Sequence, residues 1–187
     1  MAAFTEQECR EIEINEEKQK YWDDLREVFQ KISQGLARIN NRSCERAIWE
    51  LLQNAGDYRA NGPAQVELKL TKEDLYFKHH GLAFTQRTLE DLIRQRSSKN
   101  DKTKVGRFGT GFMTTHVFSR KVYISGSCYV EFGDKRLYLP FDNFCLNRDF
   151  TDKEEFIKEA DRALARKKEI LKSDGSDVDV YPTIFRY

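Results

Sequence analysis

Residues 43–58 carry the pattern that most restricts the fold, because it divides a helix into two unlike stripes. Glu50, Asn54 and Asp57 are spaced at i, i+4 and i+7. At about 100° per residue they fall within roughly 60° of one another around a helix. The opposite stripe is apolar and contains Ile48, Leu51, Leu52 and Ala55. We predict a helix that buries this stripe in a core. The polar stripe is either a solvated surface or one wall of a binding site.

The remaining periodicity predicts further helices and strands along the chain. We expect helices at residues 16–34, 86–95, 112–118 and 152–171, and strands at residues 65–70, 75–78, 120–127, 128–133, 135–140 and 178–187. Helices dominate the first part and strands the second, which predicts an α+β fold. The expected architecture is a two-layer sandwich, with helices on one face of a mixed, mainly antiparallel sheet. Residues 1–15 are polar, and we expect them to form a loose N-terminal arm.

Length, charge, hydropathy and cysteine spacing limit the classes of protein to which this chain can belong. The 187 residues are most simply one domain, and 32 basic against 31 acidic residues give a net charge of +1. This balance gives no sign of nucleic acid or an anionic membrane as partner. The N-terminus has no signal-peptide pattern, and no apolar run has membrane-spanning length. The four cysteines (Cys9, Cys44, Cys128 and Cys145) form no C-x-x-C pair, so we expect reduced thiols and a cytoplasmic location.

A glycine cluster, Gly106-Arg107-Phe108-Gly109-Thr110-Gly111, leads directly into the predicted helix 112–118. Glycines let backbone amides approach an anion closely, and a helix start adds unpaired amides. The spacing G-x-x-G-x-G is neither a Walker A loop nor a dinucleotide fingerprint. A tight turn uses the same residues, so the cluster alone leaves both readings open.

Taken in order, the polar helix stripe, a Gly-x-x-Phe turn at residues 81–84, a polar segment and the glycine cluster resemble the GHKL ATPases. This superfamily includes gyrase B, MutL, histidine kinases and the ninety-kilodalton heat-shock chaperones. Ser97-Ser98-Lys99 and residues 106–112 are most similar to sacsin-type and chaperone-type domains. The resemblance covers roughly residues 20–187 and implies a Bergerat fold, with an ATP-binding domain over residues 16–187. It also implies that this domain is the N-terminal module of a larger protein.

The resemblance implies a role for each matching residue. Glu50 matches the general base that activates water, and Asn54 matches the ligand of a Mg²⁺ ion that bridges the phosphates of ATP. Asp57 matches a polar residue near the adenosine. The phosphate loop would comprise Gly106, Gly109 and Gly111, with backbone amides from Arg107, Phe108 and Thr110. Lys99 would lie in a lid, Gly81 and Phe84 in the adenine motif, and Thr183 would help to hold adenine through water.

His79 departs from the family pattern. The superfamily usually has Asp at this position, where a carboxylate accepts a hydrogen bond from the adenine amino group. A neutral imidazole offers one acceptor nitrogen, and an imidazolium offers none. With a reference pKa of about 6.5, His79 would make ATP binding weaken as the pH falls through that region.

Two functions follow from the resemblance. The first is a Mg-dependent ATPase with slow turnover that acts as a conformational switch in a chaperone-like or sacsin-like protein. Its partners would be ATP and ADP, downstream domains of the same protein, and a second copy in an ATP-dependent homodimer. The alternative is a nucleotide-binding interaction module with vestigial hydrolysis. Glu50 favours the first and the replacement of Asp by His79 favours the second. A histidine kinase fits less well, because no phosphoacceptor-histidine helix precedes the motif.

Overall fold

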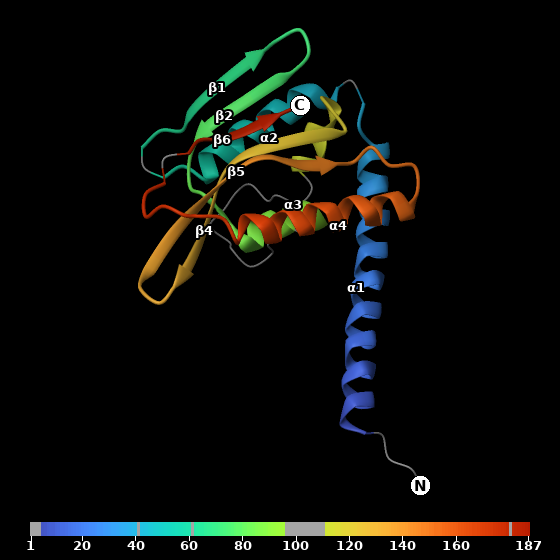
Figure 1. Ribbon diagram of the computed structural model, residues 1–187. Helices are drawn as coiled ribbons and strands as arrows, with labels where there is room; N and C mark the ends of the chain where they lie inside the picture. Colours follow the sequence, from blue (N-terminus) through green and yellow to red (C-terminus); the bar gives the residue numbers. More distant parts are fainter. Residues whose placement is uncertain (1–4, 41, 61, 96–110, 180) are drawn as a thin grey trace.

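A computed structural model describes residues 5–40, 42–60, 62–95, 111–179 and 181–187. The helices are α1 (Glu6–Ala37), α2 (Ser43–Asp57), α3 (Gln86–Arg94), the 3₁₀ helix η1 (Phe112–Val117) and α4 (Lys153–Ile170). The strands are β1 (Gln65–Leu70), β2 (Leu75–His80), β3 (Phe84–Thr85), β4 (Lys121–Phe132), β5 (Lys135–Asn147) and β6 (Thr183–Arg186). Figure 1 shows their arrangement. Within the described ranges, no helix has the length and apolar character needed to cross a lipid bilayer.

The sheet is open and mainly antiparallel, with the strand order β1-β2-β6-β4. β5 pairs with β4 along nearly its whole length, so β5 occupies one edge of β4. Residues 123–125 of β4 pair with β6, and residues 128–129 pair in parallel with β3. β3 and β6 therefore share the other edge of β4. This arrangement brings the start of β3 next to the start of β6.

A bulge explains why β5 is longer than its sequence pattern predicts. Ile124 pairs with Phe144 and Gly126 with Phe141, so β5 has one residue more than β4 between these pairs. Asn143 has a φ of 52°, and its N–H donates to Ser125 Oγ at 3.2 Å. The predicted end of the strand at residue 140 is therefore wrong. The two predicted strands 120–127 and 128–133 are one continuous strand, β4.

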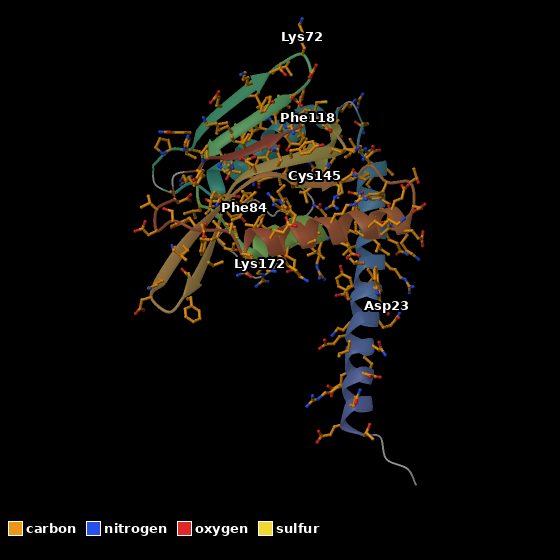
Figure 2. All side chains as sticks on the ribbon, in the orientation of Figure 1. Asp23, Lys72, Phe84, Phe118, Cys145 and Lys172 are labelled. Atoms are coloured by element: carbon orange, nitrogen blue, oxygen red, sulfur yellow. The ribbon has the colours of Figure 1, made fainter. Side chains whose placement is uncertain are left out.

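The helices and one face of the sheet form a single core. Phe77, Ile124, Phe144 and Phe185 from the strands are buried together with apolar residues of all five helices. In Figure 2, Phe84 lies inside the fold, and Lys72 marks the tip of the β1–β2 hairpin. This arrangement fits the predicted α+β sandwich. Leu52 was expected in the core, but 38% of its surface is exposed.

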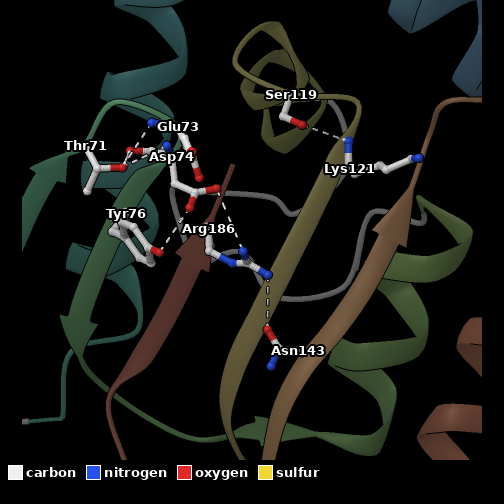
Figure 3. A network of polar contacts seen from close by, with 8 residues as sticks. All are labelled: Thr71, Glu73, Asp74, Tyr76, Ser119, Lys121, Asn143 and Arg186. Atoms are coloured by element: carbon white, nitrogen blue, oxygen red, sulfur yellow. Dashed lines mark hydrogen bonds and ion pairs between the residues drawn. The ribbon is translucent and has the colours of Figure 1, made fainter.

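Polar contacts join four strands on the other face of the sheet, which Figure 3 shows from close by. Arg186 in β6 lies 3.8 Å from Asp74 and donates to Asn143 Oδ1 at 3.3 Å. Tyr76 in β2 donates its hydroxyl hydrogen to Asp74 at 3.2 Å. The guanidinium of Arg186 also lies over the ring of Tyr123 in β4, 4.3 Å from its centroid. These contacts fix β6 between β2 and β4.

α1 differs most from expectation at its N-terminal end. The helix begins at Glu6, so the loose arm predicted for residues 1–15 is wrong for residues 6–15, and residues 1–4 lie outside the described part. Only the C-terminal part of α1 contributes to the core, through Leu25, Val28, Ile32 and Leu36. The N-terminal part projects away from the other elements (Figure 1).

Candidate functional site

Four of the predicted site residues line one cavity, although they belong to four different elements. Asn54 comes from α2, His79 from β2, Phe84 from β3 and Thr183 from β6. The strand register explains part of this convergence, because His79 and Thr183 are directly paired between β2 and β6. Residues paired across antiparallel strands direct their side chains to the same face. Phe84 joins them because β3 shares an edge of β4 with β6.

Two buried polar atoms in this cavity have no hydrogen-bond partner in the described part of the chain. Among the described residues, nothing forms a hydrogen bond with Asn54 Oδ1 or His79 Nδ1. Only 4% of Asn54 and 5% of His79 is exposed. Buried acceptors without partners are costly and uncommon in folded proteins, and they are found where a ligand or water completes the bonding. The cavity therefore presents hydrogen-bonding capacity that the described residues do not use.

His79 is neutral over the physiological range. Burial, with a smaller contribution from neighbouring His80, lowers the pKa of His79 from 6.5 to about 4. The rings of Phe185 and Phe77, which are paired with each other across β6 and β2, lie near the imidazole with centroid distances of 6.2 Å and 6.1 Å. The sequence-based expectation of a transition near pH 6.5 is therefore wrong. A neutral imidazole keeps one acceptor nitrogen for a ligand.

Gly81 allows the end of α2 to approach the segment after β2. A Cβ atom at Gly81 would lie 2.5 Å from the carbonyl oxygen of Tyr58 and 3.1 Å from His79 Nδ1. The same carbonyl oxygen accepts the N–H of Leu82 at 2.6 Å. Any side chain at position 81 would push these groups apart. Gly81 thus holds the segment between His79 and Phe84 against α2.

The cavity is narrow in this structure. Its volume is about 10 Å³, which is the room that one water molecule needs. Leu82, at the rim, is half exposed. A purine ring is much larger, so it would enter only after the lining side chains had moved apart.

Glu50 lies one helical turn before Asn54 and contacts Gly111. A Cβ atom at Gly111 would lie 2.8 Å from Glu50 Oε1 and would overlap with Oε2. The side chain of Glu50 is 17% exposed, and Arg46 Nε lies 3.6 Å from Oε1. Gly111 is fixed in turn by Thr114, whose N–H and hydroxyl both donate to its carbonyl oxygen. The structure thus joins the polar stripe of α2 to the end of the glycine cluster.

Asp57 is the half-buried last residue of α2 and is not among the described residues that line the cavity. Six further residues lie outside the described part of the chain, namely Lys99, Gly106, Arg107, Phe108, Gly109 and Thr110. The expected helix after Gly111 is the six-residue 3₁₀ helix η1.

Sequence reasoning missed several lining residues. Tyr58, Leu82, Ala83, Thr88 and Phe185 also line the cavity. The sequence does contain a pattern that locates Thr88. Thr85 and Thr88 have the spacing of a capping box, which they form at the start of α3. Thr88 N–H donates to Thr85 Oγ1 at 2.9 Å, and Thr85 N–H donates to Thr88 Oγ1 at 2.7 Å. Phe185 follows Thr183 by two residues in β6, so the alternation of a strand places both side chains on the same face.

The described residues around the cavity suit a Mg²⁺ ion that is bound mainly through phosphates. No cluster of three or more histidine, cysteine or acidic side chains suited to a metal ion occurs in the described ranges. A Mg²⁺ ion bound mainly by phosphates needs few protein ligands, and a carboxamide oxygen suits it. Asn54 Oδ1 is buried and has no partner in the described part, which fits such a role.

Comparisons with known proteins were made on the whole sequence. No protein-family model matches it, and a search of curated proteins found no match either. The resemblance to GHKL ATPases is therefore an expectation that rests on the sequence motifs.

Proposed function

We propose that this chain is a Bergerat-type domain that binds ATP together with Mg²⁺ and hydrolyses it slowly. The observation that carries the proposal is the convergence of Asn54, His79, Phe84 and Thr183 on one cavity. The resemblance assigned these residues to one nucleotide site from motifs that are far apart in the chain. Four residues from distant parts of the chain line one cavity, and two of them carry a buried polar atom without a partner among the described residues.

In this proposal the adenine ring lies between α2 and the sheet, and the phosphates extend toward Glu50 and Gly111. His79 Nδ1 accepts a hydrogen bond from the adenine amino group, and Thr183 assists through its hydroxyl. Asn54 Oδ1 would hold the metal ion, which would neutralise part of the phosphate charge. Glu50 accepts a proton from the attacking water. Lys99 and residues 106–110 would contact the phosphates.

The domain would act as a switch within a larger chaperone-like or sacsin-like protein. Because the cavity must widen to admit a purine, nucleotide binding would change the packing around Leu82 and Tyr58. Downstream domains, and a second copy joined in an ATP-dependent manner, would respond to that change. We also propose a cytoplasmic location, since the described cysteines Cys44, Cys128 and Cys145 are free thiols.

A nucleotide-binding interaction module without effective hydrolysis is the second candidate. The histidine at position 79 favours it, because this residue replaces the family's carboxylate. Binding of ATP without turnover in the purified chain would support this candidate.

Isothermal calorimetry with ATP and GTP, each with and without Mg²⁺, tests the proposal. We expect ATP to bind more tightly than GTP, and Mg²⁺ to strengthen the binding. Absence of ATP binding, or equal affinity for both nucleotides, would contradict the adenine assignment.

A further inference from the structure

β1 forms an exposed border of the sheet. Among the described strands it pairs only with β2, and in Figure 1 it lies at the outer end of the sheet. All six of its residues are exposed. The exposed fractions of Val66, Leu68 and Leu70 are 37%, 52% and 78%. Edge strands usually carry features that prevent pairing with another chain, and three exposed apolar residues in alternation are the opposite of such protection.

The apolar side chains of β1 belong to the helix-covered face of the sheet. Val66 pairs with His79 and Leu68 with Phe77, and both of these partners are buried. The helices thus cover this face over β2 but leave it open over β1. Glu67 and Lys69 occupy the other face, where Lys78 Nζ lies 3.3 Å from Glu67.

α2 carries a second exposed apolar surface. Trp49 is 71% exposed and Leu52 is 38% exposed. Leu52 lies about 160° around the helix from Asn54. Since Asn54 faces the cavity between β2, β6 and β3, the flank with Trp49 and Leu52 faces away from that cavity. This flank and the β1 border are thus two exposed apolar surfaces outside the proposed nucleotide site.

The backbone of β1 is ready to form hydrogen bonds. Leu75 exchanges two hydrogen bonds with Tyr187, at 3.1 Å and 3.0 Å, so its N–H and C=O point toward β6 and away from β1. Its partner Leu70 must then direct its own N–H and C=O away from β2, because such pairs alternate along antiparallel strands. By the same alternation, Leu68 and Val66 also direct these groups to the free edge.

We propose that β1 is a homodimer interface, at which two copies pair their β1 strands antiparallel about a two-fold axis at Leu68. Leu68 then lies opposite Leu68 of the second copy, and Val66 lies opposite Leu70. All three residues exchange backbone hydrogen bonds across the axis. The two sheets then join into one.

The charges of Glu67 and Lys69 favour this register over the neighbouring ones. With the axis at Leu68, Glu67 lies opposite Lys69 of the second copy, and this attraction occurs twice. An axis at Glu67 places two glutamates opposite each other, and an axis at Lys69 places two lysines opposite each other. An axis between two residues pairs the apolar face with the charged face. Like charges opposite each other destabilise a strand pair, whereas opposite charges stabilise it. This self-complementarity favours a second copy over an unrelated extended peptide.

Sedimentation equilibrium of the chain without nucleotide tests the proposal. We expect a concentration-dependent dimer. Lys69→Glu makes both charge pairs repulsive and should weaken dimerisation by about tenfold or more. Glu67→Lys combined with Lys69→Glu restores opposite charges and should restore the dimer. Lys72→Glu, at the hairpin tip, makes the same charge change outside the seam and should have no effect.

A cross-linking experiment tests the register. In a background with Cys9 and Cys44 replaced by Ser, Leu68→Cys should form an intermolecular disulfide under mild oxidation. Hydrogen-bonded antiparallel pairs have Cα atoms about 5.5 Å apart, which a disulfide spans. Lys69→Cys should not cross-link, because its partner is Glu67. A monomer at every concentration, a dimer insensitive to Lys69→Glu, or a double variant that fails to recover the dimer would overturn the proposal, even if an extended peptide bound to β1.

Discussion

His79 and Thr183 lie directly opposite each other where β2 pairs with β6, and both line the cavity beside Asn54. They are more than a hundred positions apart in the chain. The register of a four-residue strand therefore decides whether the two side chains share a site. Arg186, through its contacts with Asp74 and Asn143, helps to fix that register from the other face of the sheet.

Asn54→Ala should abolish the strengthening of ATP binding by Mg²⁺. Its Oδ1 would supply one metal ligand, and no described residue competes for it. Removing an unpartnered group costs few hydrogen bonds, so we expect stability to change by less than about 1 kcal/mol. Calorimetry with and without Mg²⁺, together with urea unfolding, checks both points. Gln53→Ala, on the same helix, is the control. If Mg²⁺ strengthened ATP binding equally in parent and variant, the metal assignment would be wrong.

Glu50→Ala should keep ATP binding and lose turnover. Loss of a positioned general base typically reduces the rate about 10²–10⁴-fold. Steady-state phosphate release and calorimetry measure the two effects separately. Glu45→Ala, at an exposed position in the first turn of α2, should leave both unchanged. A variant that hydrolyses ATP at the parent rate would remove Glu50 from the reaction.

Gly111→Ala should displace the carboxylate of Glu50, because the new Cβ would overlap with it. We expect turnover to fall as in Glu50→Ala, while the domain remains folded. Gly56→Ala is the matched control, since a Cβ there meets no atom within 4 Å. The control should be about as stable as the parent or slightly more stable, because alanine favours a helix over glycine by about 1 kcal/mol. Normal turnover in Gly111→Ala would show that the contact with Glu50 has no bearing on activity.

ATP affinity should stay constant as the pH falls from about 8 to about 5.5, because burial keeps His79 neutral in this range. His79→Ala should bind ATP more weakly, with an equally flat profile. Calorimetric titration across the range, corrected for protonation of the nucleotide, provides the measurement. A decline centred near pH 6.5 in the parent but not in the variant would mean that His79 titrates at its ordinary value.

The free energy of unfolding should decrease below pH 6.5. Burial lowers the pKa of His79 to about 4, and burial with the nearby charge of Arg148 lowers that of His116 to about 3. The unfolded chain takes up protons on both residues below about pH 6.5 while the folded chain does not, which lowers stability. Their contribution is complete above that pH and is lost at about 1.4 kcal/mol per pH unit for each histidine.

Urea unfolding at pH 7.5, 6.5 and 5.5 measures this slope. His79→Asn should remove the part that belongs to His79 and leave that of His116. Equal slopes in parent and variant would contradict a neutral His79 in the folded state.

Regular periodicity made several elements predictable. β1 occupies residues 65–70 as expected, and α2, α3 and α4 agree with their predicted ranges to within one or two residues. Each of these has a clear apolar stripe or alternation. The polar first half of α1 has no such stripe, so the sequence did not distinguish a projecting helix from a loose arm. In β5 the bulge at Asn143 shifts the alternation, which hid the second half of the strand.

The sequence named four of the residues that line the cavity, but it missed the five others and the environment that they create. Motifs placed Asn54, His79, Phe84 and Thr183 in one site, and the fold brings them together. The lowered pKa of His79 depends on Phe77, Phe185 and the burial that they create, which no local pattern reveals. The exposure of Leu52 likewise depends on where the sheet ends.

Because α1 is long and its C-terminal part is packed in the core, a small tilt of the helix displaces its N-terminal tip by several ångströms. Its packed end touches η1, where a Cβ at Gly35 would lie 3.0 Å from Met113 Cγ, and η1 begins beside Gly111 and Glu50. Since a helix rises 1.5 Å per residue, a tilt of about 10° pivoting at Leu25 would move Glu6 by about 5 Å. The same tilt would move Gly35, on the other side of the pivot, by about 2.6 Å, so a displacement where η1 meets Gly35 would be roughly doubled at the far tip without any residue in between changing its conformation.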